Sequence, residues 1–316
     1  MAVDGLHIIA ERDVGLFSLV QQVIGNVPWA LAEGRVPVVD FGRRTCYWTP
    51  RGFRNRTSVW EYYFEPLDRT RPAVSIPDEA RASLTWEPPA ADDVGYRMAG
   101  GTFISAHFGD HPELSGATMP IPYEWQDPDD DLRRSAKGII ERYVRPRPPL
   151  QGRVARFAAT HLAGAPLIGV HARGTDAISE QELRPHRRGS LVLARYVDEL
   201  HRLLEEMPTA RIFVASDDER SLQHLRQAFL GRVIAWASVR HHGGAGAGHG
   251  PTGWLMPAYI AGNRDLAARN GEDAVIEYLL LSRCDYLVHN GSSLARTVLL
   301  NAPHLPHTNT HTMFRS

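Results

Sequence analysis

Residues 285–300 read Asp-Tyr-Leu-Val-His-Asn-Gly-Ser-Ser-Leu-Ala-Arg-Thr-Val-Leu-Leu, and this stretch contains the pattern that repeats through the chain. The largely apolar run at 285–289 predicts a short buried strand, and the apolar spacing from Ser292 to Leu300 predicts a helix. The Asn-Gly-Ser-Ser sequence between them is typical of a tight turn that leads into a helix capped by serine. A strand followed directly by a helix is the building unit of a parallel α/β sheet.

The same unit recurs upstream. Strands are predicted at 166–171, 211–216 and 233–236, and helices at 153–161, 191–206, 220–229 and 271–283. Near the N-terminus, a strand at Leu6–Ala10, a helix from about Val14 and a strand at 35–41 give another β-α-β unit. We therefore expect an α/β fold with a doubly wound parallel sheet in the C-terminal half.

The length of 316 residues predicts two domains, because one domain typically has about 100–200 residues. The proline-rich segment 145–150 cannot continue the helix predicted at 129–144, because proline lacks the N–H donor and clashes with the preceding turn. We place the boundary in this segment, with an N-terminal α/β domain at 1–150 and a C-terminal Rossmann-like domain at 151–316. Segment 42–128 is irregular in pattern and is expected to form long loops.

Composition excludes several functional classes. The formal net charge of −1 gives no overall attraction to nucleic acids, and two distant cysteines form neither a disulfide framework nor a zinc site. No apolar run approaches the roughly 18 residues of a membrane span, and the first 15 residues lack the pattern of a signal peptide. A cytoplasmic location is therefore expected. Lys137 is the only lysine, so anion binding would depend on arginine, histidine, hydroxyls and backbone N–H groups.

Three polar clusters each follow a predicted buried strand. They contain His171, Arg173 and Asp176; Ser216, Asp217 and Asp218; and Asn290, Ser292, Ser293 and Arg296. The carboxyl ends of parallel strands meet at one edge of a sheet, where ligands of such sheets bind. We therefore expect the three clusters to line one crevice.

Each cluster has a binding and a structural interpretation. Arg173 could hold a diphosphate with two hydrogen bonds, or form a buried pair with Asp176. The two aspartates 217 and 218 could accept hydrogen bonds from a nucleoside, or one of them could cap the following helix. Ser292 could open an anion site at a helix N-terminus or simply cap that helix. Arg296, one turn into the helix, favours the anion interpretation.

The ordered motifs resemble those of the fucosyltransferase superfamily, which includes α1,6-fucosyltransferases, nodulation fucosyltransferases and protein O-fucosyltransferases. The motifs are His171-x-Arg-x-x-Asp, Ala215-Ser-Asp-Asp and Asp285-Tyr-Leu-Val-x-Asn-x-Ser-Ser. The resemblance covers most of 167–301 and, more loosely, the first 70 residues, which look like bacterial members. It implies a GT-B architecture, in which two Rossmann-like domains face a central cleft. It also implies an inverting, metal-independent transfer of fucose from GDP-fucose to an oligosaccharide or small-molecule acceptor, with no cofactor.

The resemblance also implies roles for individual residues. Arg173 would grip the β-phosphate of the donor, with His171 and Asp176 on either side of it. The pair Asp217 and Asp218 would contact the nucleoside, and Ser292 and Ser293 the diphosphate. The N-terminal domain would hold the acceptor. Glu180 or Glu182 stands near the place of the candidate catalytic base, although a glutamate there could equally be a solvated loop residue.

Other interpretations remain open from the sequence. The α1,6 enzymes have lysine where this chain has Ala177, so a different nucleotide sugar or a non-catalytic nucleotide-sugar-binding protein are alternatives. The loop at 241–253 contains His241, His242 and His249. These histidines could form a metal site, but the loop has no cysteine or carboxylate at ligand spacing, which favours a loop that closes over the donor. The aromatic residues Tyr47, Trp48, Trp60, Tyr62 and Tyr63 could stack on sugar rings or pack in the core.

Overall fold

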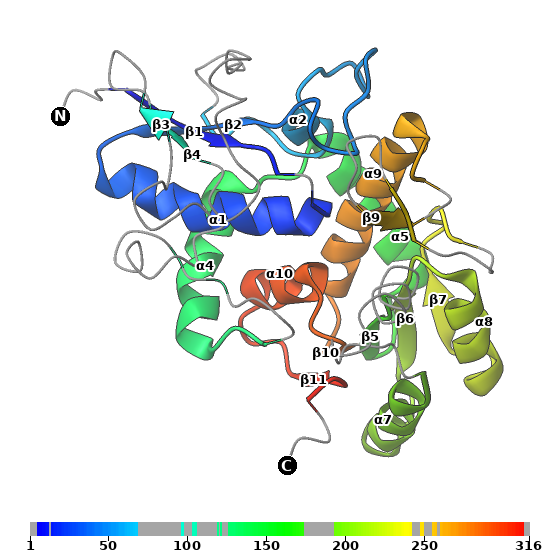
Figure 1. Ribbon diagram of the computed structural model, residues 1–316. Coiled ribbons are helices and arrows are strands. Elements are labelled where there is room, and N and C mark those ends of the chain that lie inside the picture. Colours follow the sequence, from blue (N-terminus) through cyan, green and yellow to red (C-terminus); the bar gives the residue numbers. More distant parts are fainter. Residues whose placement is uncertain are drawn as a thin grey trace.

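The computed structural model describes residues 5–12, 14–68, 96–97, 103–105, 119, 121, 126–173, 193–241, 247–249, 255–257 and 260–312. The described residues contain two mainly parallel sheets joined by helices (Figure 1). The N-terminal sheet has the strand order β2-β1-β4-β3. Its strands are β1 (Leu6–Ala10), β2 (Val36–Asp40), β3 (Tyr96–Arg97) and β4 (Phe103–Ser105).

The N-terminal β-α-β unit is confirmed. Strand β1 pairs in parallel with β2 and with β4, and only β3 runs antiparallel to its neighbour β4. Helix α1 (Leu16–Ala32) connects β1 to β2, and most of its residues are buried because it lies between the two halves of the molecule (Figure 1). Its first residues line the cleft described below.

The C-terminal sheet is parallel throughout and has the order β11-β10-β5-β6-β7. Its strands are β5 (Leu167–His171), β6 (Arg211–Ala215), β7 (Val233–Ala235), β10 (Tyr286–His289) and β11 (His307–Asn309). The chain proceeds from β5 to β6 and β7 on one side and returns to β10 on the other side of β5. The strand order therefore reverses between β5 and β10, and ligands of doubly wound sheets bind at such a reversal.

Helices cover this second sheet and connect it to the first. They are α5 (Pro148–His161), α7 (Leu193–Glu206), α8 (Glu219–Ala228), α9 (Arg264–Leu281) and α10 (Ser293–Asn301). The short α2 (Val59–Tyr63) and the longer α4 (Asp130–Tyr143) belong to the first half of the sequence, and β8 (Ala247–His249) pairs antiparallel with β9 (Leu255–Pro257). Helix α10 packs against both α1 and α4, so elements from the two halves of the sequence are in direct contact.

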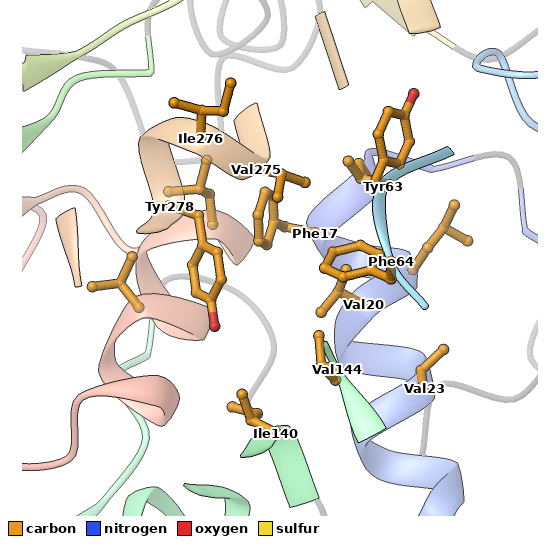
Figure 2. Packing of buried hydrophobic residues seen from close by; sticks show 14 of the residues in the cluster. Phe17, Val20, Val23, Tyr63, Phe64, Ile140, Val144, Val275, Ile276 and Tyr278 are labelled. Atoms are coloured by element: carbon orange, nitrogen blue, oxygen red, sulfur yellow. The ribbon is translucent and has the colours of Figure 1, made fainter. Parts of the chain in front are cut away.

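One large hydrophobic cluster runs through this contact region. Figure 2 shows part of it, with Phe17, Val20 and Val23 from α1, Tyr63 and Phe64 at α2, Ile140 and Val144 at the end of α4, and Val275, Ile276 and Tyr278 from α9. The cluster includes Val144 and Leu150, on either side of the proline-rich segment, so the hydrophobic packing does not mark a boundary there. The domain boundary proposed in segment 145–150 stays a prediction.

Two sequence expectations need correction in their boundaries. Helix α5 begins at Pro148 rather than at residue 153, because proline at the first helical positions costs no hydrogen bond and has a suitable φ. Helix α9 begins at Arg264, where the side chain of Asn263 accepts a hydrogen bond from the N–H of Leu266, rather than at residue 271. Among the described residues, no helix combines the length and the apolar character needed to cross a bilayer. The cytoplasmic location stays a prediction.

The aromatic residues of the irregular segment are mainly core residues. Trp60, Tyr62 and Tyr63 are each at most 2% exposed. The hydroxyl of Tyr63 donates to the backbone oxygen of Ala268, and it lies so close to α9 that a Cβ on Gly271 would come within 2.4 Å of it. Glycine at 271 thus lets α2 and α9 approach each other closely.

Candidate active site

A cleft of about 160 Å³ lies where α1, α9 and α10 meet the carboxyl ends of β5 and β6. It contains residues from both halves of the sequence. The lining from the predicted strand-end clusters is His171, Arg173, Ser216, Asp217, Ser292 and Ser293; the rest includes Gly15 to Ser18, Tyr47, Ser238, Asn270, Asp273 and Glu277. The three predicted clusters therefore do converge, at the point where the strand order of the sheet reverses.

His171 joins the first and third clusters. The parallel register places it opposite His289 of β10 and Ala215 of β6. Its Nδ1 lies 3.0 Å from the Oγ of Ser292. The same Ser292 Oγ accepts from the N–H of Ala295, so one hydroxyl contacts both the start of α10 and His171. Burial lowers the pKa of His171 to about 4, despite the opposing effect of Asp217, so the ring is neutral at pH 7.

The two neighbouring aspartates have different positions. Asp218 caps α8: its carboxylate accepts from the N–H groups of Arg220 and Ser221 and from the Ser221 hydroxyl. Its carboxylate is 3% exposed, and it is not among the cleft-lining residues. Asp217 does line the cleft, as does Ser216, whose hydroxyl donates to the backbone oxygen of Ala172 at 2.7 Å. The capping interpretation thus holds for Asp218, and only Asp217 is placed to meet a ligand.

The turn before α10 is held from several sides. Gly291 has a φ of 76°, which favours glycine, and its N–H donates to Nδ1 of His289 at 2.9 Å. The hydroxyl of Ser293 lies 3.0 Å from that of Ser18, which comes from the start of α1. Arg296 donates to the Ser293 hydroxyl at 3.1 Å. Arg296 and Asn290 are both 3% exposed, and neither is among the residues that line the cleft.

Helix α9 contributes two carboxylates to the cleft that are not among the polar clusters predicted at the strand ends. Asp273 accepts from the indole N–H of Trp236 and from the N–H of Val239. Glu277 accepts from the hydroxyl of Ser238 at 2.7 Å. Burial raises the pKa of Glu277 to about 8, although Ser238 and Arg240 lower it. A sequence signal existed: two acids four residues apart in a mainly apolar helix mark one polar face within a buried environment.

Tyr47 combines a buried ring with a hydroxyl that holds the start of α1. Its ring is 5% exposed, but its hydroxyl accepts from the N–H of Leu16 at 3.0 Å and lines the cleft beside the start of α1. Arg173 is the only cation among the described lining residues. Asp176, Glu180, Glu182 and His242 lie outside the described residues, as do the side chains around His249. Their predicted roles, including that of the catalytic base, stay predictions.

Comparisons place this arrangement among solved structures. Neither a protein-family model nor a curated protein sequence matches the chain. The structure of NodZ α-1,6-fucosyltransferase soaked with GDP-fucose superimposes with a TM-score of 0.54 and 17% identity, over 94% of this chain and 92% of that one. The same TM-score and identity are found for NodZ from Bradyrhizobium, over 95% and 92% of the two chains. POFUT1 in complex with GDP-fucose gives 0.52 and 12%, over 97% and 98%.

The chain therefore has the GT-B fold of these fucosyltransferases. This result confirms the predicted fold class, an α/β architecture in which two Rossmann-like units face a central cleft. The cleft described above lies between these two units, with α1 on one side and the ends of β5 and β6 on the other.

Proposed function

We propose that the chain is an inverting glycosyltransferase that transfers a sugar, most simply fucose, from GDP-sugar to a saccharide or small-molecule acceptor. One observation carries this proposal: Arg173, Asp217 and the Ser292–Ser293 turn line a single cleft at the reversal of strand order. The cleft thus brings together a cation, a carboxylate and a helix N-terminus, which are groups that can bind the phosphates and the nucleoside of a nucleotide diphosphate.

The diphosphate would bind at Arg173 and the N-terminus of α10. The guanidinium is planar and matches phosphate oxygens with two parallel hydrogen bonds. The first N–H groups of α10 have no partner within the helix, and the helix dipole favours negative charge at that end. Ser292 satisfies the N–H of Ala295, which leaves the preceding N–H groups of the turn for an anion.

The base would be recognised by the acidic side chains of α9. Guanine presents two adjacent N–H donors, at N1 and at the exocyclic amine, and one carboxylate can accept from both. Glu277 is the candidate for this role, because its side chain lines the cleft. Burial raises the pKa of Glu277 to about 8, so the carboxyl group largely holds a proton at pH 7 in the ligand-free protein and must release it to accept both donors. Two N–H donors favour the ionised form, so GDP binding would release a proton from Glu277.

Catalysis would consist of leaving-group stabilisation together with base assistance. The acceptor oxygen forms a bond to the anomeric carbon while the bond from that carbon to the β-phosphate oxygen breaks on the opposite face. The acceptor proton passes to a carboxylate, for which Glu180 and Glu182 are the candidates. The negative charge that grows on GDP is stabilised by Arg173 and the α10 N-terminus, which supply positive electrostatic potential without a metal ion.

A second candidate is a nucleotide-sugar-binding protein without transferase activity. Ala177, at the place where the α1,6 enzymes have lysine, is the observation in its favour. Such a protein would bind GDP-sugar in the same cleft and release neither GDP nor free sugar.

Turnover of GDP-fucose tests the proposal and separates the two candidates. We expect release of GDP from GDP-fucose by the wild-type chain, accelerated by an acceptor mixture and unchanged by EDTA. Arg173→Ala should reduce this rate on the order of 10²–10³-fold. Arg269→Ala is the matched control, because Arg269 is exposed on α9 and does not line the cleft. Equal rates for both variants and the wild type would show that Arg173 does not take part in the reaction. Binding of GDP-fucose without any release of GDP would favour the second candidate function.

A further inference from the structure

Outside the cleft, the side chains of Asp127, His289 and His307 form a compact group. They come from the segment before α4, the end of β10 and the start of β11. One potential ligand atom from each residue lies within 4.8 Å of the others. His289 is fully buried, whereas the side chains of Asp127 and His307 are 24% and 21% exposed, so the group can be reached from solvent.

The nitrogen atoms of His307 have distinct environments. Its Nδ1 lies 3.4 Å from the backbone oxygen of Leu305, which can only accept, so this nitrogen carries the proton in the neutral ring. Its Nε2 then directs a lone pair at Oδ2 of Asp127, 3.6 Å away. Two electron-rich atoms that face each other are stabilised by a cation between them.

The other two members complete the arrangement. Oδ1 of Asp127 lies 3.7 Å from Nε2 of His289 and accepts a hydrogen bond from the amide of Asn309 at 3.0 Å. Nε2 of His289 is buried and has no hydrogen-bond partner among the described residues. Because Nδ1 of His289 accepts from the Gly291 N–H, Nε2 carries the proton of the neutral ring, and a metal ion would take the place of that proton. Ligating histidines typically donate the N–H of their second ring nitrogen to a backbone carbonyl, as His307 does here. Ligating carboxylates typically accept a hydrogen bond from a neighbouring side chain, as Asp127 does from Asn309.

We propose that Asp127, His289 and His307 bind a divalent transition metal of the zinc class. The carboxylate-to-imidazole separations of 3.6 and 3.7 Å are too long for charge-assisted hydrogen bonds. They are close to the roughly 3.4 Å that separates two ligands of a tetrahedral ion with bonds of about 2.1 Å. Two imidazoles and one carboxylate are a suitable ligand set for such an ion, with water in the fourth position.

The site is connected to the cleft through His289. In the metal-free protein, Nδ1 of His289 accepts from the N–H of Gly291, which begins the Ser292–Ser293 turn. A metal on Nε2 requires the proton on Nδ1, where it would face the Gly291 N–H as a second donor. The turn must then move away from His289. On the proposed function this turn binds the diphosphate, so metal binding should weaken nucleotide binding, and nucleotide binding should weaken metal binding.

Metal binding is measured without nucleotide, so the result does not depend on the proposed function. The probe is Zn²⁺ in competition with a chromogenic chelator, together with the visible absorption of bound Co²⁺. We expect one site in the wild type, with at least tenfold weaker affinity in Asp127→Asn and in His307→Gln. His304→Gln is the matched control, because His304 is exposed near β11 and lies outside the group.

Unfolding transitions recorded in EDTA establish that each variant is folded. Retention of wild-type Zn²⁺ affinity in folded Asp127→Asn and His307→Gln would overturn the metal site, because binding would then occur at surface histidines. Absence of a Zn²⁺ site in the wild type would overturn it as well. With the site established, Zn²⁺ should weaken GDP binding roughly fivefold or more in the wild type and leave it unchanged in His307→Gln.

Discussion

The Oγ of Ser292 caps α10 and also lies 3.0 Å from Nδ1 of His171, so one hydroxyl joins two strand ends of the C-terminal sheet. The neighbouring hydroxyls of Ser293 and Ser18 extend this connection to α1, at the opposite wall of the cleft. The candidate phosphate-binding turn is thus held by hydrogen bonds to both halves of the molecule before any ligand arrives. Such preorganisation is what electrostatic stabilisation of a leaving group requires.

Replacing Ser292 by alanine should affect stability and binding together. The N–H of Ala295 and Nδ1 of His171 each lose a partner in this variant. Loss of an N-cap costs about 1–2 kcal/mol, measured as the free energy of urea unfolding. GDP affinity, measured by calorimetry, should fall as well, because the turn becomes less ordered.

Thr160→Ala is a suitable control, since Thr160 is exposed and its hydroxyl bonds only within α5. A Ser292→Ala variant that is destabilised yet binds GDP as tightly as the wild type would show that the turn is only a structural cap.

Glu277 should make stability depend on pH. Burial raises its pKa from 4.5 to about 8, so the folded protein keeps a proton that the unfolded chain releases. The stability associated with this group is fully present below pH 4.5 and is lost as the pH rises through 8. Between these values the contribution falls by up to about 1.4 kcal/mol per pH unit.

Urea unfolding of the wild type and of Glu277→Gln at pH 5, 6, 7 and 8 measures this effect. The variant should lack the decline contributed by the carboxyl group, so the two stability curves should diverge with rising pH. Parallel curves would mean that Glu277 is ionised throughout, contrary to its buried position.

Tyr47→Phe should destabilise the start of α1. The variant leaves the buried N–H of Leu16 without its acceptor, which costs about 1–3 kcal/mol. Tyr62→Phe is the matched control, because the Tyr62 hydroxyl accepts from the N–H of Thr49 at a longer 3.4 Å. We expect the larger loss of unfolding free energy in Tyr47→Phe; the reverse order would contradict the assignment of Tyr47 to the positioning of α1.

Glu272 connects α9 to two other parts of the chain. Its carboxylate accepts from Arg54 through two nitrogens and from Arg153 of α5. Although burial opposes it, the two arginines lower the pKa of Glu272 below 4.5, so its stabilising effect is present above pH 4.5 and is lost as the pH falls below that value.

Glu272→Gln should therefore lower the free energy of unfolding at pH 7 by about 1–3 kcal/mol, as monitored by urea titration. The difference from the wild type should shrink towards pH 4. Arg54→Ala should have a smaller effect, because the Arg54 side chain is 54% exposed. A difference that stays constant from pH 7 to pH 4 would rule out the charge of Glu272 as its cause.

The sequence predicted the sheet because its strands are apolar runs that end in polar clusters, and such runs remain buried in any α/β arrangement. The cleft was only partly predictable. Asp217, Ser292 and Ser293 follow strands directly, whereas Glu277 lies on a helix and depends on how α9 packs. Asp127 and His307 are far apart in sequence and meet only through tertiary packing, so no local spacing identifies them. Boundaries at Pro148 and Arg264 depended on capping and turn geometry, which short apolar patterns do not specify.

Calorimetric titration of the purified chain with GDP, UDP, ADP and dTDP in the presence of EDTA tests whether the cleft binds a guanine nucleotide. We predict that GDP binds at a single site and that the other three nucleotides bind at least tenfold more weakly. Arg173→Ala should weaken GDP binding, whereas Arg269→Ala should not. Equal affinity for all four nucleotides would contradict the proposal that side chains of α9 recognise guanine. No binding of any nucleotide would contradict the assignment of the cleft to a nucleotide sugar.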